Sequence, residues 1–146
     1  MKVLLDTSVL VAACVERHPN HLPAFEWLKK AGAMEIKAVV AAHSLLETFS
    51  VLTRAPFKPR IGPEEARKLI ASNIYATSSI IALTANEYTK IINDLANSGF
   101  TGGIVYDGLI VLCAEKAKAK KIVTSNTADY TRLTKALGLE IEIAGL

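Results

Sequence analysis

Short apolar runs alternate with longer segments of helical periodicity along this chain. The apolar runs predict strands at residues 2–5, 37–42, 80–83, 121–124 and 140–143. Between them, apolar residues recur at the spacing of the buried face of a helix. Strands that alternate with helices are typical of a parallel sheet with helical crossovers, so we expect an α/β fold with a central sheet of about five strands flanked by helices.

Prolines, glycines and capping residues mark the expected helix boundaries. The pattern predicts helices over residues 7–18, 23–30, 44–54, 84–99, 104–118 and 127–137, and a further helix that begins at Pro63. Thr84 and Glu87 have the spacing of a capping box, and Gly138 is placed to end the last helix. Neither a repeat nor a change of composition divides the chain, so we expect residues 1–146 to form one domain.

Composition narrows the functional classes only slightly. The net charge of +3 and the pI near 8.9 permit an anionic partner without demanding one. Cys14 and Cys113 lie in apolar helical segments without metal-ligand spacing, which favours reduced, packed thiols. The chain has no signal-peptide pattern, and no apolar stretch reaches the roughly 18 residues of a membrane span, so we expect a soluble, cytoplasmic protein.

Three carboxylates stand where apolar or capping residues are more usual. Asp6 ends the first predicted strand, while Glu47 and Asp107 lie in the first turns of two predicted helices. Asp6 could simply cap the helix that follows, and Glu47 could complete a capping box begun by Ser44. Asp107 shares a helical stripe with apolar Ile110, so its side chain is expected to face the sheet.

Taken together, the three acids predict a divalent cation site. Open parallel sheets bind ligands beyond the carboxyl ends of their strands, and this is the edge that Asp6, Glu47 and Asp107 are expected to reach. Carboxylates gathered there repel one another unless a cation lies among them. Oxygen ligands without Cys or His favour Mg²⁺ or Mn²⁺ over zinc. We therefore expect a metal-dependent phosphodiesterase that acts on RNA.

Other classes of site have weaker support. His18, His21 and His43 form no zinc motif, and the chain has neither a Gly-x-Ser-x-Gly elbow nor a dinucleotide fingerprint. A phospho-signalling module that binds Mg²⁺ stays open as an alternative. Such a module predicts adjacent acids near the first strand, however, and hydroxyl residues follow Asp6 instead. The lack of an acid at position 8 also argues against haloacid-dehalogenase-like phosphatases.

Four short segments resemble the successive motifs of the PIN-domain family. They are VLLDTS (residues 3–8), SLLETFSVLTR (44–54), YDGLI (106–110) and IVTSNTADY (122–130), in the family's order and at family-like separations. The resemblance covers almost the whole chain. A chain of this length is most similar to the VapC-type toxin ribonucleases of toxin–antitoxin pairs.

This resemblance implies a Mg²⁺- or Mn²⁺-dependent endoribonuclease that forms a homodimer and is inhibited by a cognate antitoxin. Asp6, Glu47 and Asp107 map onto the family's three core acids, with Asp6 and Asp107 as direct metal ligands and Glu47 as a ligand or a holder of water. The family often has an acid where this chain has Asn126. The next acid, Asp129, either serves the site or only occupies the first turn of the last helix. The number of ions, and a catalytically silent PIN scaffold that binds RNA or protein, therefore stay open.

Hydroxyl and basic residues complete the expected site. Four hydroxyl residues are expected either to hydrogen-bond the carboxylates or the phosphate, or only to cap helices and contact solvent: Thr7, Ser8, Thr124 and Ser125. Asn126 could bind the ion through its carbonyl oxygen or hold a water. Arg54, Lys58 and Arg60 form a basic stretch that either contacts the RNA backbone or is a solvated loop stiffened by proline. Phe57 is the aromatic residue best suited to stack on a base. Exposure of the second helix or of residues 56–63 would indicate a groove for the antitoxin.

Overall fold

The structure is a computed structural model that describes residues 1–146. Its strands are β1 (Lys2–Leu5), β2 (Lys37–Ala41), β3 (Ser78–Ile81), β4 (Lys121–Val123) and β5 (Glu142–Ala144). Its helices are α1 (Thr7–Cys14), α2 (His21–Gly32), α3 (Ala42–Arg54), α4 (Pro63–Ile70), α5 (Ala85–Asn97), α6 (Ile104–Ala117) and α7 (Thr127–Ala136). A π-helical turn, η1 (Ala71–Tyr75), continues α4 directly.

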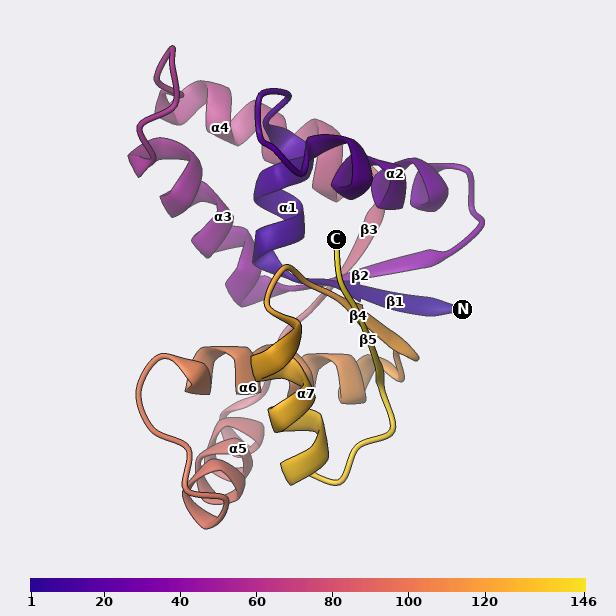
Figure 1. Cartoon of the computed structure of the whole chain (residues 1–146), viewed down its shortest axis with the longest axis vertical. Helices are drawn as coiled ribbons and strands as arrows, with labels where there is room; N and C mark the ends of the chain where they lie inside the picture. The colour runs from indigo at the N-terminus through magenta and orange to yellow at the C-terminus, as the bar shows by residue number, and fades with distance from the viewer.

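All five strands run parallel, in the order β3-β2-β1-β4-β5 (Figure 1). In the central strand, Leu4 lies opposite Val39 of β2 on one side and Ile122 of β4 on the other. This sheet confirms the predicted α/β class. The chain builds outward from β1 through β2 and β3, then crosses to β4 and β5 on the other side. The reversal places a topological switch point between the carboxyl ends of β1 and β4, where open α/β sheets bind ligands.

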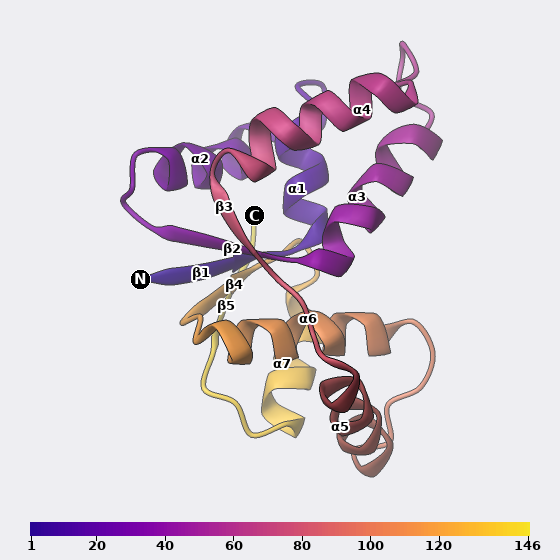
Figure 2. The same cartoon turned by 180° about the vertical axis from the view of Figure 1, so that it is seen from behind.

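Helices cover both faces of the sheet. The first four helices lie on one face and α5, α6 and α7 on the other (Figures 1 and 2). Val3 and Leu5 enter the core beneath α1–α4, whereas Leu4 joins the core beneath α5–α7. Successive strand side chains point to opposite faces, so β1 reads as a continuous apolar run because both of its faces are buried.

The boundaries of the first two helices differ from the prediction. The first helix ends at Cys14 rather than near His18, because Val15 adopts an extended conformation. Pro19 also disfavours the helical conformation in His18. The second helix begins at His21 rather than Pro23. Proline is tolerated there because the first-turn amides of a helix have no intrahelical partner.

The β3 edge strand begins two positions earlier than predicted. Ser78 pairs with Ala38 of β2, and Ser79 with Val39. Polar residues suit this strand because its residues are exposed or half-buried. The predicted capping box is confirmed, since Thr84 and Glu87 exchange two hydrogen bonds of 3.3 Å.

The two cysteines are free and buried. Burial raises the pKa of the Cys14 thiol to about 12 and that of the Cys113 thiol to about 11. Neutral, buried thiols agree with the expected packing role. None of the helices combines the length and the apolar character needed to span a membrane.

Candidate active site

The Asp6 carboxylate lies at the switch point of the sheet. Only 6% of this residue is exposed, and three hydroxyl groups surround it. Ser8 and Thr124 donate hydrogen bonds to Oδ2 at 2.9 and 2.8 Å, and Tyr130 donates to Oδ1 at 2.7 Å. Because the side chain makes no capping hydrogen bond to α1, the capping interpretation of this carboxylate is wrong. The three donors come from three different elements of the fold and fix its orientation.

A single buried hydroxyl links Asp6 to Asp107. Tyr130 of α7 is fully buried, and its hydroxyl oxygen lies 2.7 Å from Asp6 Oδ1 and 3.4 Å from Asp107 Oδ1. A phenol has one proton to donate, so the shorter contact to Asp6 is the stronger hydrogen bond. Asp107 stands in the first turn of α6, as predicted, and is half-buried. Two acids from distant parts of the chain thus meet at one hydroxyl.

Glu47 approaches the site from α3. Thr7 donates a hydrogen bond from Oγ1 to Glu47 Oε1 at 3.0 Å, which ties α3 to the start of α1. His43 Nε2 lies 3.4 Å from the same oxygen. The capping-box interpretation is wrong, because α3 already begins at Ala42 and the buried Ser44 hydroxyl has no hydrogen-bond partner. With 39% of its side chain exposed, Glu47 stands at the open rim of the site.

Asn126 and Asp129 form a hydrogen-bonded pair at the opposite rim. Asn126 donates from Nδ2 to Asp129 Oδ2 at 2.8 Å, and its backbone N–H donates to Thr124 Oγ1 at 3.0 Å. Arg132 Nη1 lies 3.5 Å from Asp129 Oδ1. Asn126 therefore orients Asp129. Asp129 occupies the first turn of α7, and its charge also reaches Asp107.

The four acids share one electrostatic environment. Burial raises the pKa of Asp107 to about 6, and repulsion from Asp6, Asp129 and Glu47 adds to the shift, while the hydrogen bond from Tyr130 opposes it. The pKa of Tyr130 is also raised, first by burial and then by the negative charges of Asp6 and Asp107. These mutual effects show that the fold gathers the predicted acids into one neighbourhood.

The donor set suits a hard divalent cation. All four acids offer carboxylate oxygens, the ligands that Mg²⁺ and Mn²⁺ prefer. As the side chains lie, no group of three His, Cys, Asp or Glu residues is arranged to hold a metal ion. Glu47 and Asp129 are only half-buried, so their side chains are free to adopt other rotamers. The chemistry of the residues fits the ion, and their mutual repulsion is what a cation would relieve.

The predicted hydroxyl residues contribute in two ways. Thr7, Ser8 and Thr124 each donate a hydrogen bond from the side chain to a site carboxylate. Ser125 takes part through its backbone N–H, which donates to Ser8 Oγ at 3.0 Å. A chain of hydrogen bonds therefore runs from the end of β4 through Ser8 to the Asp6 carboxylate.

The basic stretch lies at the far end of α3 from the site. Seven residues of helix separate Glu47 from Arg54, a distance of roughly 10 Å at 1.5 Å per residue. Arg60 donates to the backbone carbonyls of Arg54 and Ala55 at 3.0 and 3.1 Å, and so caps the end of this helix. Phe57 is half-buried against the core beneath α1–α4, which argues against the predicted stacking role.

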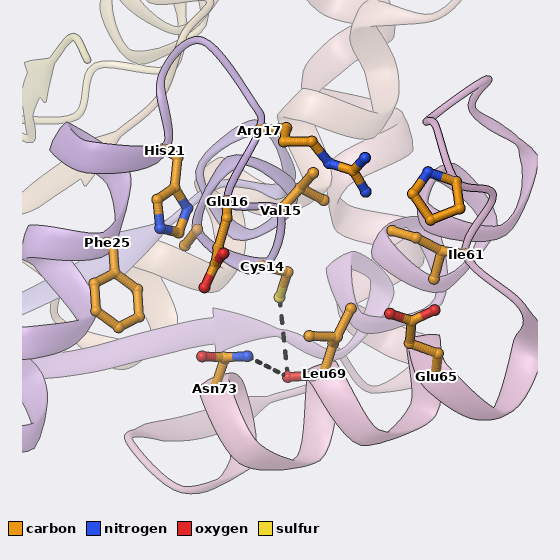
Figure 3. A pocket seen from close by; sticks show the side chains of 12 residues that line it. Cys14, Val15, Glu16, Arg17, His21, Phe25, Ile61, Glu65, Leu69 and Asn73 are labelled. Carbon is orange, nitrogen blue, oxygen red and sulfur yellow. Dashed lines mark hydrogen bonds between the residues drawn. The ribbon is translucent and has the colours of Figure 1, made fainter.

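A separate cavity of about 450 Å³ opens on the α1–α4 side of the molecule (Figure 3). Its apolar lining includes Phe25 of α2, Ile61, and Leu69 of α4. Its charged lining consists of Glu16, Arg17 and Glu65. Cys14 faces the Leu69 carbonyl, to which Asn73 donates at 2.8 Å. None of the four site acids lines this cavity, so it is distinct from the acid site.

Tyr130 and His43 lie at the site although neither was predicted as a site residue. Tyr130 lies on an apolar stripe with Leu133 and Leu137, which predicts burial, and a buried tyrosine needs a partner for its hydroxyl. His43 precedes Glu47 by four residues, the spacing at which helical side chains meet. Both signals were present in the sequence.

Comparisons with known proteins identify the family of this chain. A family model described as "PIN domain" matches residues 3–135. The chain is 34% identical over 138 residues to Ribonuclease VapC40 of Mycobacterium tuberculosis (strain CDC 1551 / Oshkosh), covering 94% of this chain and 96% of that protein. It is 32% identical over 140 residues to Ribonuclease VapC27 of Mycobacterium tuberculosis (strain ATCC 25618 / H37Rv), covering 96% and 95%.

A solved structure gives the same result for the fold. VapBC2 from Rickettsia felis, crystallised bound to a DNA fragment from its promoter, matches with a TM-score of 0.66 at 16% identity over 100% of this chain and 99% of that chain. The sequence relatives and the family model identify the same family, and the shared fold agrees with it. The chain belongs to the PIN-domain family, among its VapC ribonucleases.

Proposed function

We propose that this chain is a Mg²⁺- or Mn²⁺-dependent endoribonuclease and the toxin of a toxin–antitoxin pair. The ribonuclease names of its relatives support the activity. The observation that carries the proposal is the buried Asp6 carboxylate, joined to Asp107 through the Tyr130 hydroxyl at the switch point. Two carboxylates held this close repel each other and lower the stability of the fold, so a catalytic role accounts for them better than a structural one.

Each acid has a distinct proposed task. Asp6 and Asp107 would hold the ion, Asp6 through Oδ1, because its Oδ2 already accepts two hydrogen bonds. A bound Mg²⁺ or Mn²⁺ would supply the positive charge that polarises water and offsets charge on the phosphate oxygens. Glu47 would share in binding the ion or take the proton from the attacking water, through Oε1 or Oε2 at the open rim. Asp129, oriented by Asn126, would hold a water on the opposite side.

The decisive test is a cleavage assay on total RNA with mapping of the new ends. The wild type should cleave with Mn²⁺ and stop when EDTA is added. Asp107→Asn should lower the rate by at least roughly 100-fold, because several kcal/mol of charge stabilisation depend on the ion. Asp94→Asn is the matched control, since Asp94 lies on α5 and pairs with Lys90 at 2.9 Å, outside the site.

Three outcomes would count against this proposal. Cleavage that persists in EDTA would exclude a metal-dependent mechanism. Asp107→Asn cleaving at the wild-type rate would remove Asp107 from the site. A wild type that binds RNA without cutting it under any divalent ion would favour the catalytically silent scaffold.

The basic stretch is the proposed path of the RNA backbone. Arg54, Lys58 and Arg60 are exposed at the end of the helix that carries Glu47. The double variant Arg54→Gln/Lys58→Gln should weaken RNA binding and flatten its dependence on salt by about one unit of slope per lost phosphate contact. Arg60 is kept because it also caps α3. Unchanged binding at several salt concentrations would place the RNA elsewhere.

A cognate antitoxin is the proposed partner for the cavity beside α2. The second helix and the proline-rich segment both line it, through Phe25 and through Pro59 and Ile61. Its apolar floor and charged rim suit a peptide with apolar anchors between charged residues. A protein encoded next to this chain should co-purify with the wild type and bind Phe25→Asp at least roughly tenfold more weakly. Equal affinity for both would place the antitoxin on another surface.

Homodimerisation is proposed through the outer face of α3. Leu46 is 71% exposed beside a pocket of about 280 Å³, whose lining includes Phe49, Ile70 and Tyr75. Burying this apolar surface against a second copy would remove it from water. Sedimentation should detect a dimer for the wild type and a monomer for Leu46→Glu. A monomeric wild type at micromolar concentration would contradict this assignment.

A further inference from the structure

Two aromatic rings stack beside the acid site. His43 lies in the first turn of α3 and Tyr106 in the first turn of α6. Their ring centroids are 5.5 Å apart and their planes differ by 3°. α3 and α6 lie on opposite faces of the sheet (Figure 2), so this contact joins the two helical layers.

Both rings adjoin proposed catalytic acids. Tyr106 immediately precedes Asp107 in the chain, and His43 Nε2 lies 3.4 Å from Glu47 Oε1. A ligand group bound on these two rings would therefore lie next to a ligand bound by the acids. Neither aromatic residue was predicted to have a role in the site.

Core packing does not account for the position of Tyr106. The residue is 55% exposed and belongs to neither apolar core. Tyr75 and Tyr88 are exposed to a similar extent, but neither stacks on another ring. His43 stacks on one face of the Tyr106 ring, so the opposite face is the one on which a further flat group would stack.

We propose that Tyr106, supported by His43, is the surface on which an unpaired base next to the cleaved phosphate stacks. The inference rests on the proposed function, since it names a feature of the RNA substrate. Aromatic side chains bind single-stranded RNA in this way because every base has a flat face to offer. A base inside a duplex is covered on both faces by its neighbours, so this surface selects single-stranded or looped RNA.

The experiment combines protein variants with changes to the RNA. An oligoribonucleotide with a mapped cleavage site is prepared with an abasic residue at each flanking position in turn. Its kcat/KM is measured with the wild type, Tyr106→Leu, Tyr106→Phe and Tyr88→Leu. Tyr88→Leu is the matched control, because it removes a tyrosine of similar exposure from α5, which contributes nothing to the site. Thermal denaturation of each variant confirms that it folds.

Stacking predicts a specific pattern of coupling. One abasic position should lower kcat/KM of the wild type by roughly tenfold, and Tyr106→Leu should cause a similar loss on the intact RNA. The two changes together should cost little more than either alone, because they remove the same contact. Tyr106→Phe should keep most of the activity, and Tyr88→Leu all of it. The proposal would be overturned if the abasic RNA and Tyr106→Leu lowered kcat/KM independently, so that their effects multiplied. It would also be overturned if no abasic position lowered kcat/KM of the wild type.

A binding measurement separates this inference from the ribonuclease proposal. The fluorescent base 2-aminopurine is placed at the sensitive position of the RNA, or at each position in turn if nothing is cleaved. Stacking on Tyr106 should quench the fluorescence of this base. The quenching should be lost in Tyr106→Leu and kept in Tyr88→Leu. Tyr106-dependent quenching without cleavage would support the stacking surface while contradicting the ribonuclease. Cleavage without such quenching would contradict only the stacking surface.

Discussion

The acid site has an inner group and an outer group, which are held in different ways. The inner group is Asp6, Asp107 and Tyr130, and the outer group is His43, Glu47 and Asp129. In the inner group, Asp6 is buried and accepts hydrogen bonds from Thr124 and Tyr130. These donors lie 118 and 124 positions further along the chain. In the outer group, Glu47 contacts His43 one helical turn away and accepts one hydrogen bond from Thr7, 40 positions away. Asp129 contacts only Asn126 and Arg132, three positions away, and both outer acids are partly exposed.

This difference separates fixed geometry from adaptable geometry. Buried, long-range hydrogen bonds hold the inner group wherever the sheet and its helices are folded. The outer acids keep 39% and 35% of their side chains exposed, so they can rotate toward an ion or a water. We therefore expect changes to the inner group to affect metal binding and folding together, and changes to the outer group to affect mainly the rate.

The largest expected effect is that of Asp6→Asn. Loss of this carboxylate should lower RNA cleavage at least roughly 100-fold, because both the ion and the hydroxyl network depend on it. Glu47→Gln should lower cleavage by less, on the order of tenfold. Single-turnover cleavage with saturating Mn²⁺ measures both. An equal loss in the two variants would remove the distinction between inner and outer acids.

Tyr130→Phe removes a single buried hydroxyl from the inner group. Asp6 Oδ1 would lose its hydrogen bond, and we expect Mn²⁺ to bind roughly tenfold more weakly. The unsatisfied acceptor should also lower the free energy of unfolding by about 1–2 kcal/mol. Calorimetric titration and urea denaturation measure the two effects, with Tyr88→Phe as the control. Unchanged values in both would show that the hydroxyl does not support the acids.

Asp107 should make the metal-free protein less stable as pH rises. Its folded pKa of about 6 lies above the ordinary 3.8, so between these values the folded state binds more protons than the unfolded state. The free energy of unfolding should therefore fall between about pH 4 and pH 6, by on the order of 1–2 kcal/mol. This value is reduced because solvent screens the charge of a half-buried group.

Denaturation in EDTA across this pH range tests that expectation. Asp107→Asn should reduce the slope and be more stable than the wild type at pH 7, whereas Asp94→Asn should keep the slope. Addition of Mn²⁺ should stabilise the wild type at pH 7 more than Asp107→Asn. If the stability of the wild type and that of Asp107→Asn change equally between pH 4 and pH 6, the raised pKa of Asp107 is contradicted.

The smallest expected effect is that of Asp129→Asn at the outer rim. Because Asp129 is half exposed and already pairs with Asn126 and Arg132, we expect cleavage to fall only a few-fold, roughly the effect of one water-orienting group. Metal affinity should change little. Steady-state cleavage across Mn²⁺ concentrations separates these parameters. A loss as large as that of Asp6→Asn would make Asp129 a full member of the inner group.

Local rules predicted most elements of the fold and failed at identifiable places. The strand pattern and the capping box at Thr84 gave the correct class of fold, because they depend on residues close together in sequence. The capping interpretations of Asp6 and Glu47 used the same local rules and were wrong. In both cases a hydroxyl group took the place of the expected helix amide: Ser8, Thr124 and Tyr130 for Asp6, and Thr7 for Glu47.

The sequence by itself determined which acids this protein has, and that strand ends and helix starts would carry three of them to one edge of a parallel sheet. Only the tertiary structure decided how these acids are held. The shared Tyr130 hydroxyl, the raised pKa of Asp107 and the pairing of His43 with Tyr106 each join residues from separate elements. Periodicity describes contacts within an element, whereas burial and charge repulsion depend on distances that exist only after the chain has folded.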